Sequence, residues 1–173
     1  MKHMMIDLET LATSANALVV SVGACTFDQH QIYKKGYWVL NQTEQHRKGR
    51  AISPSTVQWW MGQNDQARSV FKEKEVLTLE KFAIAFALFF EGEQFHLWGN
   101  GADFDLSIMI DLWERHSLEK IPGWRYYNHM CYRTFKTLFK CGNLTTRQGT
   151  HHNALDDAIF QAENVIASGK LSV

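Results

Sequence analysis

The chain has 173 residues, and 45% of them are hydrophobic, which fits a single globular domain over residues 1–173 with a substantial core. Its 18 basic and 18 acidic side chains give a formal net charge of zero. This balance argues against a protein that holds duplex DNA through an overall positive charge. It leaves room for an enzyme of nucleic acids whose acidic, metal-binding site offsets a local basic surface.

The cysteines and apolar segments bear on where the protein works. The three cysteines show no CxxC spacing, so we expect reduced thiols in a cytoplasm-like compartment rather than disulfides or a zinc site. The first ten residues lack the features of a signal peptide. The longest apolar run, residues 82–90, is far shorter than the roughly 20 residues that cross a bilayer. We therefore expect a cytoplasmic protein without membrane contacts.

The pattern of apolar residues predicts strands and then a mixture of helices and strands. Strands are expected at residues 2–9, 18–27, 32–41 and 95–100, with a hairpin turn at 28–31. Helices are expected at residues 53–60, 64–71, 78–91, 103–116, 131–140 and 153–167. This order predicts an α/β domain with a mixed central sheet. Its hairpin strands should be antiparallel, and strands after a crossover helix should run parallel to the first.

Two acidic residues stand two positions apart in the first strand, in the sequence MIDLET. Asp7 and Glu9 should project from the same face, because side chains alternate along a strand. Buried carboxylates on one face need a cation or hydrogen-bond donors, and hard cations such as Mg²⁺ or Mn²⁺ meet that need. The alternative is an ordinary strand end with solvated acids, which this stretch favours when taken alone.

A second acidic pair follows the strand at 95–100, in WGNGADFDLSIM. Asp103 could cap the next helix, and Asp105 could be a first-turn acid that the helix dipole favours. The functional alternative places one of these acids opposite the carboxylates of the first strand. Binding sites in open α/β sheets gather where strands end, and the backbone of Gly99 and Gly101 could approach a ligand there.

The third stretch, THHNALDDAIFQA, opens the last helix with doubled histidines and aspartates. Such a turn is usually a solvated loop, but an imidazole near carboxylates is a natural proton acceptor close to neutral pH. Helical periodicity does not choose between Asp156 and Asp157. Both are expected to lie off the apolar face, which we assign to Leu155, Ile159, Ala162 and Ile166.

Taken together and in this order, these motifs resemble the histidine-containing DEDD (DEDDh) superfamily of 3′–5′ exonucleases. IDLET, TVQWWMGQNDQAR, WGNGADFD, YRTF and HHNALDDA resemble, more narrowly, the bacteriophage and prophage exonucleases of the exodeoxyribonuclease VIII-like or Rv2179c-like exoribonuclease group. The resemblance runs from residue 5 to about residue 167. It implies a ribonuclease H-like fold and the cytoplasm of a bacterial or phage-infected cell.

Carried over position by position, the resemblance selects the catalytic residues Asp7, Glu9, Asp105, His152 and Asp157. The four carboxylates would hold two divalent cations, Mg²⁺ or Mn²⁺, about 4 Å apart, and His152 would take a proton from the attacking water. Residues five apart in a helix point about 140° apart. We therefore expect Asp157 in the helix and His152 on the loop before it, with His151 and Asp156 shaping that region.

The resemblance also implies that the substrate is the 3′ end of single-stranded DNA or RNA. Thr10 matches a position that often contacts the terminal nucleotide. Trp59, Trp60 and Phe104 are candidates to stack on a base, and we select Trp60 with Phe104. Arg133 could bind a phosphate or form a structural ion pair, and Asn100 could contact the nucleotide or shape its turn.

Two other interpretations of the sequence stay open. The chain could be a catalytically silent nuclease fold that binds nucleic acid or a host partner, or a two-metal hydrolase of small oligonucleotides. Related exonucleases are often dimers, which allows a homodimer here. Preference for DNA or RNA depends on a contact to the 2′-hydroxyl, which the sequence does not place.

Overall fold

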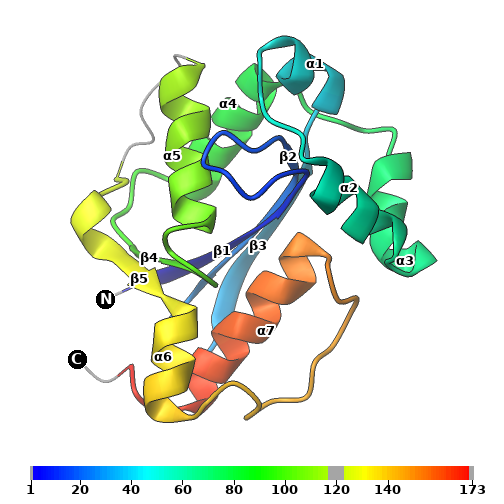
Figure 1. Ribbon diagram of the computed structural model, residues 1–173. Helices are drawn as coiled ribbons and strands as arrows, with labels where there is room; N and C mark the ends of the chain where they lie inside the picture. The colour runs from blue at the N-terminus through cyan, green and yellow to red at the C-terminus, as the bar shows by residue number, and fades with distance from the viewer. Residues whose placement is uncertain (1, 117–122, 172–173) are drawn as a thin grey trace.

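The computed structural model describes residues 2–116 and 123–171, which form a five-stranded sheet flanked by helices (Figure 1). No helix within these ranges is both long and apolar enough to cross a membrane. The strands are β1 (His3–Thr10), β2 (Val19–Phe27), β3 (Ile32–Val39), β4 (His96–Gly99) and β5 (His129–Cys131). The helices are α1 (Gln42–Arg47), α2 (Pro54–Met61), α3 (Asp65–Arg68), α4 (Leu79–Phe90), α5 (Asp105–Arg115), α6 (Tyr132–Phe139) and α7 (Ala154–Ala167), with short 3₁₀ turns η1 (Ser69–Lys72) and η2 (Tyr126–Asn128).

The sheet has the order β3-β2-β1-β4-β5 and is mixed. The hairpin strands β1, β2 and β3 are antiparallel, whereas β4 runs parallel to β1 and β5 runs parallel to β4. The predicted mixed sheet is thus confirmed. The sequence did not predict β5 or α1. The first has only three residues, and the second is a short polar helix held by its Asn41 cap.

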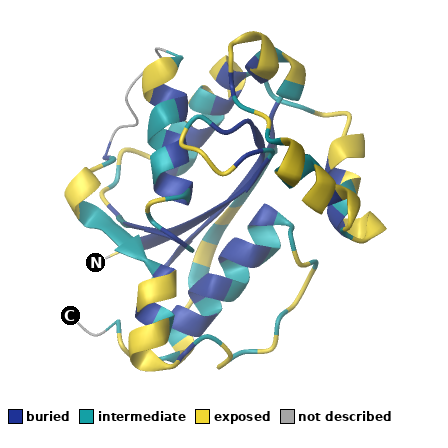
Figure 2. Ribbon diagram, in the orientation of Figure 1, coloured by how far each residue is buried: buried dark blue, intermediate teal, exposed yellow. Residues whose placement is uncertain are grey.

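Alternation along β1 divides its side chains between two cores. Met4, Ile6 and Leu8 join the core formed with the phenylalanines of α4 and the apolar face of α5. Met5 joins the opposite core, which α6 and α7 cover. Asp7 and Glu9 continue the Met5 face toward the end of the strand. Figure 2 shows β1 and β2 as a buried centre between these layers.

Gly23 in β2 brings the start of α7 very close to the sheet. A Cβ atom at this position would lie 2.2 Å from the backbone carbonyl of Ala154, so only glycine permits the contact. Gly23 is paired with Asp7 in the β1–β2 register. Because Gly23 has no side chain, the first turn of α7 packs beside the acidic end of β1.

Candidate active site

The first two carboxylates of the site project from the end of β1. The side chains of Asp7 and Glu9 lie on one face of the strand and are 8% and 7% exposed. Gln161 of α7 donates a 2.7 Å hydrogen bond from Nε2 to Oδ1 of Asp7. The strand thus presents two nearly dehydrated acids to the helix that crosses it, rather than the solvated strand end that was the alternative.

The third carboxylate, Asp105, comes from the first turn of α5. Its oxygens accept hydrogen bonds from the backbone N–H of Leu8, at 3.2 Å, and of Gly101, at 3.3 Å. A Cβ atom on Gly99 would come within 2.9 Å of the Asp105 side chain, so glycine leaves space for it. Asp105 is 2% exposed, whereas Asp103 points into solvent. Burial therefore distinguishes these acids in favour of Asp105.

The fourth carboxylate, Asp157, lies on the buried face of α7. The buried residues of α7 are Ala154, Asp157, Ala158, Gln161, Ala162, Asn164 and Val165. The expected apolar face through Leu155 and Ile159 was wrong, because these residues are only partly buried. Asp156 instead points toward the preceding loop and accepts a 2.7 Å hydrogen bond from the Thr150 N–H.

The two oxygens of Asp157 have different partners. Oδ2 accepts a 3.0 Å hydrogen bond from the backbone N–H of His152. Oδ1 pairs with the guanidinium of Arg147, which also lies 4.3 Å from the centre of the Phe160 ring. Arg147 is the only basic side chain of the described residues that forms an ion pair with these four carboxylates. One positive charge therefore faces four carboxyl groups in this cluster.

Burial raises the pKa values of Asp7, Glu9 and Asp105, and neighbouring negative charges raise those of Asp7 and Glu9 further. Burial, followed by the charges of Asp105, Glu9 and Asp157, raises the pKa of Asp7 well above its usual range. Burial, followed by the charges of Asp157 and Asp105, raises the pKa of Glu9 to about 8, and burial raises the pKa of Asp105 to about 7. One oxygen each of Asp7, Glu9 and Asp157 lies within 4.8 Å of the others. Such a group is suited to hold divalent cations.

His152 lies on the loop before α7, as predicted, and its backbone has a φ of +66°. Its ring makes edge-to-face contacts with Trp59, at 4.8 Å between ring centres, and with His151, at 4.1 Å. Partial burial and the neighbouring His151 lower the pKa of His152. The imidazole is therefore neutral at neutral pH and able to accept a proton.

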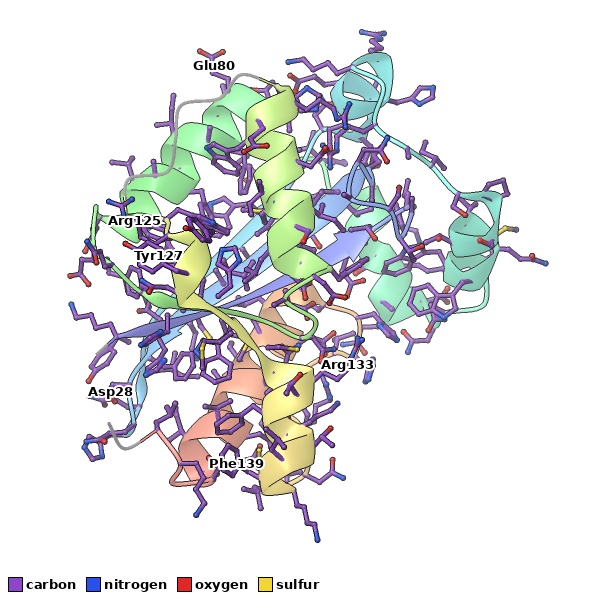
Figure 3. The ribbon with its side chains drawn as sticks, turned by 60° about the vertical axis from the view of Figure 1, so that its left-hand side comes forward. Asp28, Glu80, Arg125, Tyr127, Arg133 and Phe139 are labelled. Carbon is purple, nitrogen blue, oxygen red and sulfur yellow. The ribbon has the colours of Figure 1, made fainter. Side chains whose placement is uncertain are left out.

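A cavity of about 400 Å³ joins these groups. Its opposite wall includes Asn100, Phe104 and Arg133, with Arg133 at the N-terminal end of α6 and Phe139 at the other end (Figure 3). Among the described residues Arg133 forms no ion pair. A second hollow of about 330 Å³ adjoins the first through Leu8 and Glu9. Its lining also includes Thr10, Thr13, Ser55, Thr56 and Trp59.

A family model for the Rv2179c-like 3′–5′ exoribonuclease domain matches residues 2–168. The chain belongs to this family. Among curated proteins, the exodeoxyribonuclease of Enterobacteria phage T4 is 23% identical over 122 residues, which cover 62% of this chain and 53% of the phage protein. The chain thus spans about half the length of this relative.

Solved structures share the fold of this family member. The nuclease domain of 3′hExo, a DEDDh family member bound to rAMP, aligns with a TM-score of 0.64 and 10% identity over 95% of this chain and 90% of that one. E. coli exonuclease I in complex with a dT13 oligonucleotide gives a TM-score of 0.62 and 14% identity, over 98% and 40% of the two chains. The ribonuclease H-like fold is thereby confirmed.

Trp60 does not fit the stacking role predicted for it. The residue is 3% exposed, and its indole N–H donates a 2.9 Å hydrogen bond to the carbonyl of Thr10. A base requires an exposed ring face, which this tryptophan lacks. Its neighbour Trp59 is 44% exposed and borders the second hollow. The adjacent rings are therefore divided between core and surface.

Sequence reasoning missed Arg147 and Gln161, although each carries a recognisable signal. Gln161 lies four positions after Asp157, which places both side chains on one face of a helix. Arg147 is the only arginine after Arg133 and precedes the histidine pair by four residues. Nothing in the linear pattern, however, indicates that the loop carrying it folds back over the acidic cluster.

Proposed function

We propose that the chain is a metal-dependent 3′–5′ exonuclease that removes nucleotides from the 3′ end of single-stranded nucleic acid. The observation that carries this proposal is the convergence of four buried carboxylates with a single arginine as counter-ion, beside a histidine with a lowered pKa. Family membership and the fold support it. The four carboxylates come from β1, α5 and α7, and their convergence from distant parts of the chain supports a shared role.

The donor set fits two divalent cations such as Mg²⁺ or Mn²⁺. Asp7, Glu9, Asp105 and Asp157 would hold them through oxygen atoms, the ligands that such hard ions prefer. The buried Oε1 of Gln161 and Oδ1 of Asn100 also lack hydrogen-bond partners among the described residues. When bound, such cations activate a water molecule and stabilise the departing oxygen.

His152 is the proposed general base. Its neutral ring accepts a proton from the attacking water, and the edge contact with Trp59 holds the ring at the mouth of the acidic cluster. Asp157 orients the same loop by accepting the His152 N–H. Proton transfer and cation binding are thereby coupled through one short segment at the start of α7.

The two hollows suggest how a strand end would lie. We propose that Arg133 and Lys136, on the wall of the larger cavity, bind backbone phosphates by charge. The terminal nucleotide would occupy the smaller hollow, with Thr10 near its sugar and the exposed face of Trp59 against its base. Asn100 and Phe104, which line the larger cavity, would then flank the part of the strand that enters the smaller hollow.

The test uses a matched pair of acidic residues, Asp105 in the first turn of α5 and Asp103 two positions before it. End-labelled single-stranded DNA and RNA, from dinucleotides to 20-mers, are incubated with Mg²⁺ or Mn²⁺ and Asp105→Asn or Asp103→Asn protein. Asp105→Asn should abolish stepwise 3′ degradation, and exposed Asp103→Asn should not. His152→Ala should slow the reaction by roughly 10²–10⁴-fold, the usual contribution of a general base.

Two outcomes would contradict the proposal. Equal losses of exonuclease activity in Asp105→Asn and Asp103→Asn would show that the acidic cluster has no special part in the reaction. Tight binding of every substrate without turnover, with either metal, would indicate a silent binding protein instead. Activity confined to the shortest chains would identify the substrate as small oligonucleotides.

A further inference from the structure

The loop before α7 and the first turn of that helix bring together a second group of metal-ligating side chains, which shares Asp157 with the carboxylate cluster. His151, His152 and Asp157 each offer one ligand atom, and these atoms all lie within 4.8 Å of one another. The ring centres of the two histidines are 4.1 Å apart, with the ring planes at 67°. His151 is exposed to solvent, His152 is partly buried and Asp157 is buried. The group therefore has an open side through which an ion can enter.

The chemistry of these ligands differs from that of the acidic cluster. Imidazole nitrogens favour borderline ions such as Zn²⁺, whereas Mg²⁺ and Mn²⁺ prefer carboxylate oxygens. Two imidazoles and one carboxylate, with a water molecule in the fourth position, form a common tetrahedral zinc arrangement. The contact between Trp59 and His152 already holds one of the two rings in place, which reduces the ordering that binding requires.

Asp157 is buried, and both of its oxygens face groups of the loop before α7. Its Oδ2 accepts the His152 N–H, but its Oδ1 already pairs with a positive group, the guanidinium of Arg147. Arg147 lies on the same connection between α6 and α7 as the two histidines, and its side chain is 26% exposed. An incoming ion would replace one unit of positive charge with two at this oxygen.

We propose that His151, His152 and Asp157 bind a transition-metal ion of the Zn²⁺ type, and that the bound ion silences the active site. Coordination takes up the nitrogen of His152 that would accept a proton and draws Asp157 away from the carboxylate group that it shares with Asp7 and Glu9. The inhibitory part rests on the proposed exonuclease function, whereas the binding site does not. His151 is the one member of this set to which the proposed reaction assigns no role.

Calorimetry with Zn²⁺ tests the site without reference to activity. The measurements use the Asp7→Asn protein, in which the carboxylate cluster is impaired, with and without His151→Asn. Loss of one ligand should weaken Zn²⁺ binding at least about tenfold. His46→Asn, which removes an exposed histidine of α1, should leave the affinity unchanged. Equal Zn²⁺ affinity with and without His151→Asn, or an equal loss in His46→Asn, overturns the site.

The regulatory part is tested with Zn²⁺ added to the Mg²⁺-supported reaction. Each protein is compared with its own rate in Mg²⁺ alone. The concentration of Zn²⁺ that halves the rate should be at least about tenfold higher in His151→Asn than in the parent. If Zn²⁺ binds through His151 but does not inhibit, the regulatory claim is overturned. If the chain degrades no substrate while the calorimetric difference persists, the binding site stands and only the proposed function fails.

Discussion

Replacing Glu9 with glutamine should stabilise the metal-free protein, although it removes a proposed metal ligand. The Glu9 carboxyl is 7% exposed, and burial followed by the charges of Asp157 and Asp105 raises its pKa to about 8, from an ordinary value of 4.5. Below pH 4.5 the folded and unfolded states both hold the proton. Between pH 4.5 and 8 only the folded state holds it, so folding must take up a proton and stability falls as pH rises.

The magnitude follows from that pH window. Each pH unit between the two pKa values costs the folded protein about 1.4 kcal/mol. At pH 7 the total for Glu9 is about 3 kcal/mol, a large share of the roughly 5–15 kcal/mol by which a domain is stable. Glutamine keeps the shape of the side chain and has no proton to gain. The stabilisation in Glu9→Gln should therefore approach about 3 kcal/mol at pH 7 and vanish near pH 4.

Urea unfolding in the presence of a chelator, at pH 4, 5.5 and 7, measures this difference. Glu75→Gln is the matched control, because it removes the same charge from an exposed position. Saturating Mg²⁺ should reverse the order of stability, since the parent gains binding free energy that Glu9→Gln largely lacks. A Glu9→Gln protein that is no more stable than its parent at pH 7, or whose stabilisation is as large at pH 4 as at pH 7, would refute the reasoning.

Further substitutions test the counter-ion, the helix contact and the tryptophan pair. Arg147→Gln should lower the stability of the metal-free protein in urea by about 2 kcal/mol, because the guanidinium compensates the charge of the carboxylates. It should also tighten Mg²⁺ binding in calorimetry, because the guanidinium competes with the ion for Asp157. Weaker Mg²⁺ binding would contradict this. Gly23→Ala should lower urea stability by about 2 kcal/mol and weaken Mg²⁺ binding, because the added Cβ would push α7 from the sheet; unchanged stability would show that the backbones yield freely. Trp60→Ala should cost about 4 kcal/mol in urea unfolding. Trp59→Ala should cost much less stability and raise KM about tenfold in steady-state kinetics, through lost stacking. A raised KM in Trp60→Ala, with the KM of Trp59→Ala unchanged, would instead indicate that Trp60 stacks on the base.

Local sequence patterns predicted most of the fold. The apolar periodicity located β1 to β4 and the longer helices, because those elements bury enough side chains to leave a clear pattern. β5 and α1 were missed for the opposite reason. A three-residue strand shows no periodicity, and α1 is a polar helix whose only buried residue is Gln45. Their formation depends on neighbours that the local pattern does not contain.

For the site, the sequence by itself determined which chemistry was available. The alternation of β1 places Asp7 and Glu9 on one face, and helical spacing separates His152 from Asp157. The resemblance to DEDDh exonucleases then selected Asp105 and Asp157 from the doubled acids. The local placements could be predicted because a strand or helix dictates the relative direction of side chains that are close in sequence.

Only the tertiary structure decided burial and pairing. It placed Trp60 in the core and left Trp59 at the surface, although the two are adjacent and chemically alike. It also set Arg147 against Asp157 and Gln161 against Asp7, over separations of 10 and 154 residues. Which groups lose water, and which charges meet, depends on how distant elements pack, and that packing sets the pKa values on which the proposed chemistry depends.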